Sequence, residues 1–235
     1  MPIRIVQGHK HALEASHINV VIDVIRAFTV AHYAFRRGLR GIVLAGTVDE
    51  ALLLKKRNPA FLLAGEIRGL PIPGFELDNS PARLQTFDFE GKYMIQKTTN
   101  GVAATLNALH AEHVFVTGFT NARTTAEFIK RNLRKYDDMT IHLIASHPTG
   151  DDDLACAQYI SGILEGANPI SAECTIKRIR GSEAAQKFYD REQPEFLKED
   201  ISCCVQELPS DFVMKVRVVG GAPIIEKVPA GGGGI

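Results

Sequence analysis

The sequence lacks the features that mark membrane, secreted or nucleic-acid-binding proteins. Its longest apolar runs, Ile18 to Ile22 and Ala60 to Ala64, are far too short to span a bilayer. The first residues, MPIRIVQGHKH, contain no apolar signal region, so a cytoplasmic location is expected. The formal net charge is zero and no basic stripe is interleaved with aromatic residues. We therefore expect neither a membrane nor a nucleic acid as a partner.

Cysteine chemistry and the common nucleotide motifs are also missing. The four cysteines (Cys156, Cys174, Cys203 and Cys204) fit neither a zinc-ligand spacing nor a disulfide framework. Cys174 and Arg180 have the Cys-x5-Arg spacing of cysteine phosphatases, but the intervening TIKRI has no glycine and cannot easily form an anion-binding nest. Cys174 is therefore interpreted as a small buried apolar residue. No Walker loop or dinucleotide glycine fingerprint is present.

What the sequence does contain is a repeated order of apolar run, polar turn and helical segment. At 235 residues, 45% of them apolar, the chain can bury a sizeable core. Strands are expected at 3–6 (at an edge), 18–22, 41–45, 61–64, 93–97, 113–117 and 140–145. This order predicts a three-layer α/β/α fold with a mostly parallel, mixed sheet.

The C-terminal part is expected to differ from this pattern. Residues 182–199 are charged and are interpreted as helical, and 212–219 with 223–228 form an antiparallel hairpin around Gly220-Gly221. We expect one α/β catalytic unit over residues 1–229 and a flexible glycine-rich tail, AGGGGI, at 230–235.

The stretch from Phe61 to Pro81, FLLAGEIRGLPIPGFELDNSP, is the most informative. It begins as a strand that ends at Gly65, where Glu66 and Arg68 follow, and continues as a loop rich in Gly and Pro. Such loops hold a fixed backbone path. A charged pair at a strand end beside a rigid polar loop is typical of an active-site wall. The alternative is a surface connection with a chance ion pair.

Further polar residues follow other predicted strands. They are Asp23, Thr98-Thr99-Asn100, Asn121 and Asp151 to Asp153. Because the carboxyl ends of parallel strands meet at one edge of a sheet, these residues are expected to line one crevice. Structural alternatives exist: Asp151 to Asp153 suit the first turn of any helix, and Thr98 to Gly101 suit an N-cap and turn. Asp23 is more telling, since a carboxylate that ends a buried strand needs a partner.

The residue types in this crevice indicate phosphoryl chemistry. Asp23, Glu66, Asp152 and Asp153 supply hard oxygen ligands, which suit Mg²⁺. Arginines clamp anionic oxygens, and a helix start favours phosphate. The remaining candidates are anion-binding residues: Arg26, Arg68, Asn79, Ser80, Thr98, Thr99, Asn100, Gly101 and Asn121. Carboxylates for a metal beside arginines for an anion are typical of metal-assisted phosphoryl transfer.

Several segments resemble the 2-phosphosulfolactate phosphatase family. They are VVIDVIRA (20–27), AGEIRGLPIPGFELDNSP (64–81), TTNG (98–101), GFTNA (118–122) and DDLACA (152–157). The resemblance implies a Mg²⁺-dependent phosphatase that hydrolyses (R)-2-phospho-3-sulfolactate to 3-sulfolactate, on the route to coenzyme M. It also implies a three-layer fold of two similar halves, about 1–135 and 136–229, that exchange terminal strands. The chain departs from the family pattern at Ile67, where the family usually has Arg.

We therefore assign roles as hypotheses. Asp23, Glu66 and Asp153 hold the metal, with Asp152 as a further ligand or base, and Arg26 and Arg68 bind the anionic groups of a small substrate. The other anion-binding candidates complete the cradle, and the chain is expected to form a homo-oligomer, taken as a dimer. The alternative is a non-catalytic binding protein for a small phosphorylated or sulfonated anion, which would need no metal.

Overall fold

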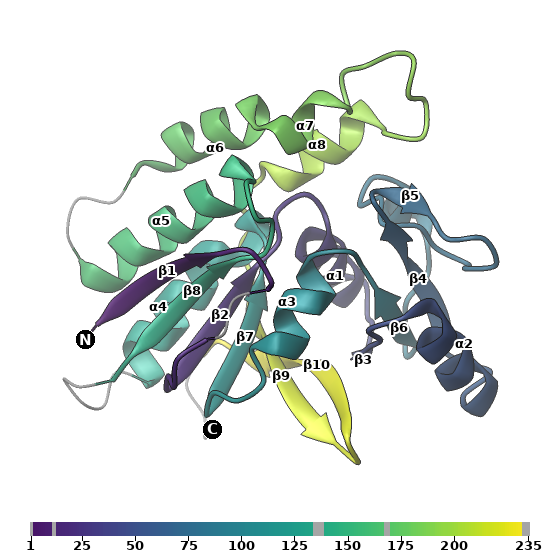
Figure 1. Cartoon of the computed structure of the whole chain (residues 1–235), viewed down its shortest axis with the longest axis horizontal. Helices are drawn as coiled ribbons and strands as arrows, with labels where there is room; N and C mark the ends of the chain where they lie inside the picture. The colour runs from purple at the N-terminus through teal and green to yellow at the C-terminus, as the bar shows by residue number, and fades with distance from the viewer. Residues whose placement is uncertain (1, 11–12, 134–138, 167–169, 232–235) are drawn as a thin grey trace.

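The computed structural model describes residues 2–10, 13–133, 139–166 and 170–231 (Figure 1). The strands are β1 (Ile3–Gln7), β2 (Ile18–Ile22), β3 (Gly41–Leu44), β4 (Leu62–Ile67), β5 (Leu70–Pro71), β6 (Tyr93–Lys97), β7 (His113–Thr117), β8 (Ile141–Ala145), β9 (Phe212–Val219) and β10 (Ala222–Pro229). The helices are α1 (Ala27–Arg36), α2 (Val48–Arg57), α3 (Gly101–Asn107), α4 (Ala122–Asn132), α5 (Asp151–Glu165), α6 (Ala172–Gly181), α7 (Glu183–Gln186) and α8 (Lys198–Cys204), with short 3₁₀ turns at Arg83–Thr86 and Phe119–Asn121.

The described strands form one mixed sheet in the order β1-β8-β2-β7-β9-β10-β3-β6-β4-β5. The strands β1, β8, β2 and β7 are parallel to one another, and so are β3, β6 and β4. The hairpin β9-β10 lies between these two blocks and pairs antiparallel with each (Figure 1). Three antiparallel steps separate β7 from β3, so the two blocks run in opposite directions. The expected mixed α/β sheet with an antiparallel C-terminal hairpin is confirmed.

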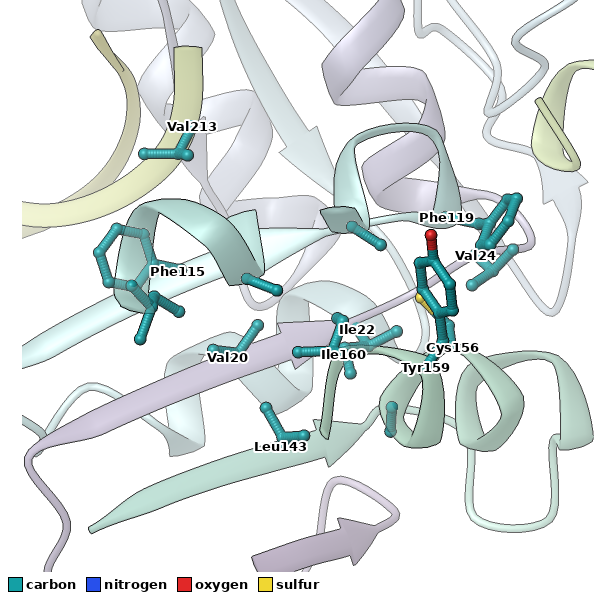
Figure 2. Packing of buried hydrophobic residues seen from close by; sticks show 14 of the residues in the cluster. Val20, Ile22, Val24, Phe115, Phe119, Leu143, Cys156, Tyr159, Ile160 and Val213 are labelled. Carbon is teal, nitrogen blue, oxygen red and sulfur yellow. The ribbon is translucent and has the colours of Figure 1, made fainter. Parts of the chain in front are cut away.

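Alternating side chains of the first block contact helices on opposite faces of the sheet. Val20 and Ile22 lie in a core with residues of α4 and α5, whereas Val21, between them, packs with residues of α1 and α3. Figure 2 shows Tyr159 and Ile160 of α5 beside the strand side chains. Because strand side chains alternate between faces, an apolar run such as INVVI is stable only when both faces are covered. The expected three layers are confirmed here.

Helix α1 connects the two blocks. Eight of its ten residues are buried, because it shares one core with β2 and β7 of the first block and with Ile42 and Met94 of the second. On the other face of the second block, α2 packs through Ala51 against Val43 and Ile95. The start of α1 is therefore a place where both blocks come together.

Some expectations about individual elements were wrong. Strand β4 does not end at Gly65 but continues to Ile67, and Gly65 has φ +151 where a Cβ would lie 1.9 Å from the carbonyl oxygen of Lys97. Only short parts of 182–199 are helical, in α7 and α8, while α6 was not predicted. Cys174 lies on α6 and is exposed, because its helix faces solvent on that side.

Two further predictions concern the chain as a whole. The single unit over 1–229 and its two halves stay predictions, although β8 of the second predicted half lies between β1 and β2 of the first. Residues 232–235 of the predicted tail lie outside the described residues. Among the helices that the structure describes, none has the length and apolar character needed to cross a bilayer.

Candidate active site

A cavity of about 390 Å³ opens beside the start of α1. Among the predicted site residues, its walls contain Asp23, Arg26, Glu66, Arg68, Asn79, Thr99 and Asn100. These come from the ends of β2, β4 and β6 and from the loop after β5. The prediction that strand ends converge in a parallel array holds for β2 and β8, whose ends meet at Ser146, but it was wrong for β4 and β6, because the hairpin reverses the second block. The ends meet around α1 instead, where the side-chain amide of Gln96 donates to the carbonyl oxygen of Ala27 at 3.1 Å.

Asp23 follows β2 and is buried at the first turn of α1. Its Oδ1 accepts the backbone N–H of Ala27 at 2.9 Å, and its Oδ2 lies 3.3 Å from the Ser146 hydroxyl, which is closer to Asp153. The start of α3 lies directly against it, since a Cβ on Gly101 would be 2.6 Å from Oδ2. Gly101 is therefore the residue that allows α3 to approach the carboxylate.

Asp152 and Asp153 lie in the first turn of α5 and are both buried. Asp153 is fully engaged: its Oδ1 accepts the N–H of Val24 at 2.8 Å, and its Oδ2 accepts the Ser146 hydroxyl and the His147 N–H, each at 3.0 Å. Asp152 is different. It is 1% exposed, and its Oδ1 has no hydrogen-bond partner within the described part of the chain. An unpartnered buried carboxylate oxygen is costly unless a ligand compensates it.

Burial and mutual repulsion weaken the acidity of these three carboxyl groups. Burial, with a contribution from the charge of Glu66, raises the pKa of Asp23 to about 6. Burial and the nearby charge of Asp23 raise the pKa of Asp152 to about 7. The pKa of Asp153 is also raised, by burial and then by Asp152 and Asp23. A cation placed among them would relieve this repulsion.

Glu66 holds together the walls formed by β4 and by the residues after β6. Its carboxylate accepts the backbone N–H of Thr99 at 2.5 Å, the Thr99 hydroxyl at 2.9 Å and the backbone N–H of Gly69 at 2.5 Å. Arg68, exposed at the cavity edge with φ +52, donates its backbone N–H to the Thr99 hydroxyl at 2.8 Å. Glu66 therefore fixes the shape of this wall.

Arg26 belongs to a buried network that is joined to the Glu66 wall through Gly69. Its guanidinium donates to Asp200 at 2.8 Å and to the carbonyl oxygen of Gly69 at 2.9 Å, and lies 5.0 Å from the centre of the Phe188 ring. Arg26 and Asp200 are 5% and 0% exposed. Asp200 also accepts the Ser80 hydroxyl at 2.6 Å. Ser80 thus lies behind the cavity wall rather than in it.

Three other predicted residues do not line the cavity. The Thr98 hydroxyl accepts the backbone N–H of Val102 at 3.0 Å, so it caps α3. Asn121 is buried between β7 and α4, where its Oδ1 accepts the Thr117 hydroxyl at 2.9 Å. Gly101, as described above, lies against Asp23. The roles assigned to these residues stay predictions.

Comparison with known proteins decides the family. The family model described as 2-phosphosulpholactate phosphatase matches residues 3–218. This chain belongs to the 2-phosphosulfolactate phosphatase family.

Individual proteins similar to this chain carry the name of the same 2-phosphosulfolactate phosphatase family. The probable 2-phosphosulfolactate phosphatase of Bacillus subtilis (strain 168) is 55% identical over 228 residues, covering 97% of this chain and 99% of that protein. The protein of that name from Caldicellulosiruptor saccharolyticus is 37% identical, covering 60% of this chain and 59% of its own. The one from Thermoplasma volcanium is 31% identical, covering 87% and 95%. The predicted class of enzyme, a phosphoric monoester hydrolase, follows from the family.

The metal expected in the 2-phosphosulfolactate phosphatase family can be tested against the donors present. In the described residues, no group of three or more His, Cys, Asp or Glu side chains is arranged to hold an ion. The oxygens of Glu66 and Asp153 are already engaged, which fits poorly with their predicted metal role. Asp23 and Asp152 do fit, because Mg²⁺ is usually bound by one or two carboxylates together with waters and substrate phosphate.

Several residues at or behind the cavity of this 2-phosphosulfolactate phosphatase family member were not predicted, and three of them bear charge or can titrate in ways that matter for the site. Lys187 and His147 line the cavity, and Asp200 orients Arg26. Asp200 carried a weak signal, as an acidic residue followed directly by the apolar ISCCV. No local motif marks Lys187, which reaches the cavity only through the packing of α7.

Proposed function

We propose that this chain hydrolyses (R)-2-phospho-3-sulfolactate to 3-sulfolactate and phosphate with the help of Mg²⁺, on the route to coenzyme M. Family membership supports the substrate. The observation that carries the metal-dependent reaction is the buried, unpartnered Oδ1 of Asp152 beside Asp23 at the cavity. A cytoplasmic location and a homodimer are part of the same proposal.

Asp23 and Asp152 are the carboxylates that we assign to Mg²⁺. Asp23 lines the cavity directly. Asp152 lies behind Gly150, which also lines it, since a Cβ on Gly150 would be 2.8 Å from Oδ1 of Asp152. When bound, a divalent ion polarises the phosphoryl group and neutralises charge that develops in the reaction. Glu66 and Asp153, whose oxygens face protein donors, act as positioning residues in this proposal.

The hydrolysis itself breaks the bond between phosphorus and the substrate oxygen and joins a water oxygen to phosphorus. A carboxylate that contacts the reacting phosphoryl group must line the cavity, and it must have an oxygen that does not already accept several hydrogen bonds. Asp152 does not line the cavity, and Glu66 accepts three hydrogen bonds. Asp23 is the remaining candidate, and a cation bound beside it would keep its carboxylate ionised, although burial raises its pKa in the metal-free protein.

The anionic substrate also needs cations and neutral donors. Arg68 and Lys187 supply positive charge at the cavity, and Asn79 and Asn100 supply amide groups. Oδ1 of the buried Asn79 has no partner within the described residues; as an acceptor it suits a water molecule, whereas only the NH₂ group of Asn79 can donate to an anionic oxygen. Arg26, predicted to bind the phosphoryl oxygens, has its guanidinium engaged by Asp200 and Gly69, and we assign it to shaping the wall.

The test is phosphate release from 2-phosphosulfolactate and from a chromogenic phosphate ester, in Mg²⁺ and in EDTA. We expect release from both in Mg²⁺, none in EDTA, and a loss of about 100- to 1000-fold in kcat for Asp23→Asn, the scale found for removing one preorganised electrostatic group. Asp151→Asn is the matched control. Asp151 lies on the same helical turn as Asp152 but pairs with Arg178 at the surface, so its replacement should leave kcat unchanged.

Two results would overturn the proposal. Phosphate release that is equally fast in EDTA would remove the metal from the reaction. An absence of release from every phosphorylated hydroxy acid tested, with and without a sulfonate, would remove the hydrolase itself.

A further inference from the structure

Lys187 lies in the wall of the active-site cavity, on the chain directly after α7. Its ammonium lies close to the β5 turn, because a Cβ on Gly69 would be 2.7 Å from Nζ. Nζ lies 4.5 Å from the ring centre of Phe196 and 5.7 Å from that of Phe188. The two rings and Gly69 therefore hold a half-buried cation at the cavity.

This cation has no carboxylate partner among the described residues, where ion pairs within 4.0 Å include none to Lys187. Glu183, one turn earlier, also lines the cavity but makes no ion pair with it. Arg26, the neighbouring buried cation, is by contrast neutralised by Asp200 at 2.8 Å. The charges of Glu66, Asp152 and Asp23 act on Lys187 from beyond ion-pair distance. Because none of these carboxylates occupies the donors of the half-buried ammonium, it is well placed to bind an anionic part of a ligand.

The chemistry of lysine favours the tetrahedral anionic groups of the proposed substrate over its carboxylate. An ammonium is a compact charge with three donors, whereas the planar guanidinium of arginine matches a carboxylate in two parallel hydrogen bonds. A sulfonate is tetrahedral at sulfur and presents three oxygens with a single charge. The phosphate monoester has the same shape, so either group suits Lys187, and the carboxylate suits Arg68 at the cavity edge. The sulfonate is assigned to Lys187 because the proposed function places the phosphate beside Asp23 and Asp152. The phosphate group is then placed in the part of the cavity that Asp23 lines.

We propose that Lys187 is the residue that binds the sulfonate of the substrate and so sets the specificity of this phosphatase for sulfonated hydroxy acids. This inference rests on the proposed function, because the substrate class is taken from it.

The first experiment compares 2-phosphosulfolactate with 2-phospholactate, which has no sulfonate, as substrates of wild type, Lys187→Met and Lys177→Met. For the sulfonated substrate we expect Lys187→Met to raise KM about 30-fold, the loss that one charge-assisted hydrogen bond implies, with kcat changed much less. The ratio of kcat/KM between the two substrates should fall by the same factor. Lys177, exposed on α6, is the control, and its variant should keep the wild-type ratio.

The second experiment measures binding rather than turnover, by calorimetric titration with 3-sulfolactate and with lactate. Wild type should bind 3-sulfolactate more tightly, and Lys187→Met should lose that preference. Lys187→Arg should keep part of it, because the charge remains. Two results would overturn the assignment. One is an equal loss of kcat/KM on the sulfonated and the unsulfonated substrate in Lys187→Met, and the other is a preference for 3-sulfolactate over lactate that this variant retains.

The two experiments separate the two hypotheses. If wild type releases no phosphate from 2-phosphosulfolactate, the proposed function fails, while the titration still tests Lys187. If wild type releases phosphate and Lys187→Met retains the wild-type preference for the sulfonated ligand, the inference about Lys187 fails alone.

Discussion

Replacing Asp152 by Asn should make the metal-free protein more stable and the enzyme inactive. Burial and the charge of Asp23 raise the pKa of Asp152 from its ordinary value of 3.8 to about 7. A carboxyl group whose pKa is raised by folding destabilises the fold when it is ionised. The penalty is absent below pH 4, grows between pH 4 and 7, and is complete above pH 7. At 1.36 kcal/mol for each pKa unit, it amounts to about 4 kcal/mol.

The assay is urea unfolding in EDTA at pH 4.5 and pH 8. We expect the free energy of unfolding of Asp152→Asn to be about 2–4 kcal/mol higher than that of wild type at pH 8. At pH 4.5 the two values should agree within about 1 kcal/mol. Asp151→Asn, which removes only a surface ion pair to Arg178, should change stability by less than about 1 kcal/mol at either pH. Mg²⁺ should stabilise wild type and leave Asp152→Asn unaffected. No gain at pH 8, or an equal gain at both pH values, would refute the reasoning.

Further predictions concern the residues that hold the site in place. Asp200→Ala removes the buried partner of Arg26 and should lower the free energy of unfolding by about 3–5 kcal/mol; a urea midpoint equal to wild type would contradict this. Glu66→Gln places an amide donor against backbone N–H groups, so unfolding measurements should show a loss of about 1–3 kcal/mol, and an unchanged stability would be the contrary result. Gly101→Ala puts a Cβ 2.6 Å from Oδ2 of Asp23; kcat should fall about 100-fold with an unaltered circular dichroism spectrum, and full activity would show that the contact is irrelevant. At subsaturating Mg²⁺, kcat/KM should rise from pH 5.5 to 8, because the pKa of Asp23 is raised to about 6 and cations bind the ionised form; a flat profile would exclude its titration.

Much of the fold could be predicted because its signals are local. The largely apolar run INVVI (18–22) appears in the structure with the predicted bounds, and Asp151 to Asp153 lie in the first turn of a helix, as their acidity suggested. The position of the hairpin between the two parallel blocks could not be predicted. Register and strand order depend on which edges remain unpaired after the rest of the sheet has formed, and no local pattern records this.

In the candidate site, too, only the features that have a local sequence signal could be predicted. Asp23 and Glu66 could be found because a polar residue at the end of a buried strand is a local anomaly. Their different roles could not, since these depend on whether donors from elsewhere occupy the oxygens, as Thr99 and Gly69 do for Glu66. Lys187 depends wholly on the tertiary packing of α7 over the cavity.

The central claim is that Asp23 and Asp152 together bind the divalent ion, and calorimetric titration of metal-free protein with Mg²⁺ tests it most directly. Wild type and Glu66→Gln should both show Mg²⁺ binding, whereas Asp23→Asn and Asp152→Asn should show at least a 10-fold weaker affinity or none. Binding by Asp152→Asn with the affinity of wild type would contradict the account.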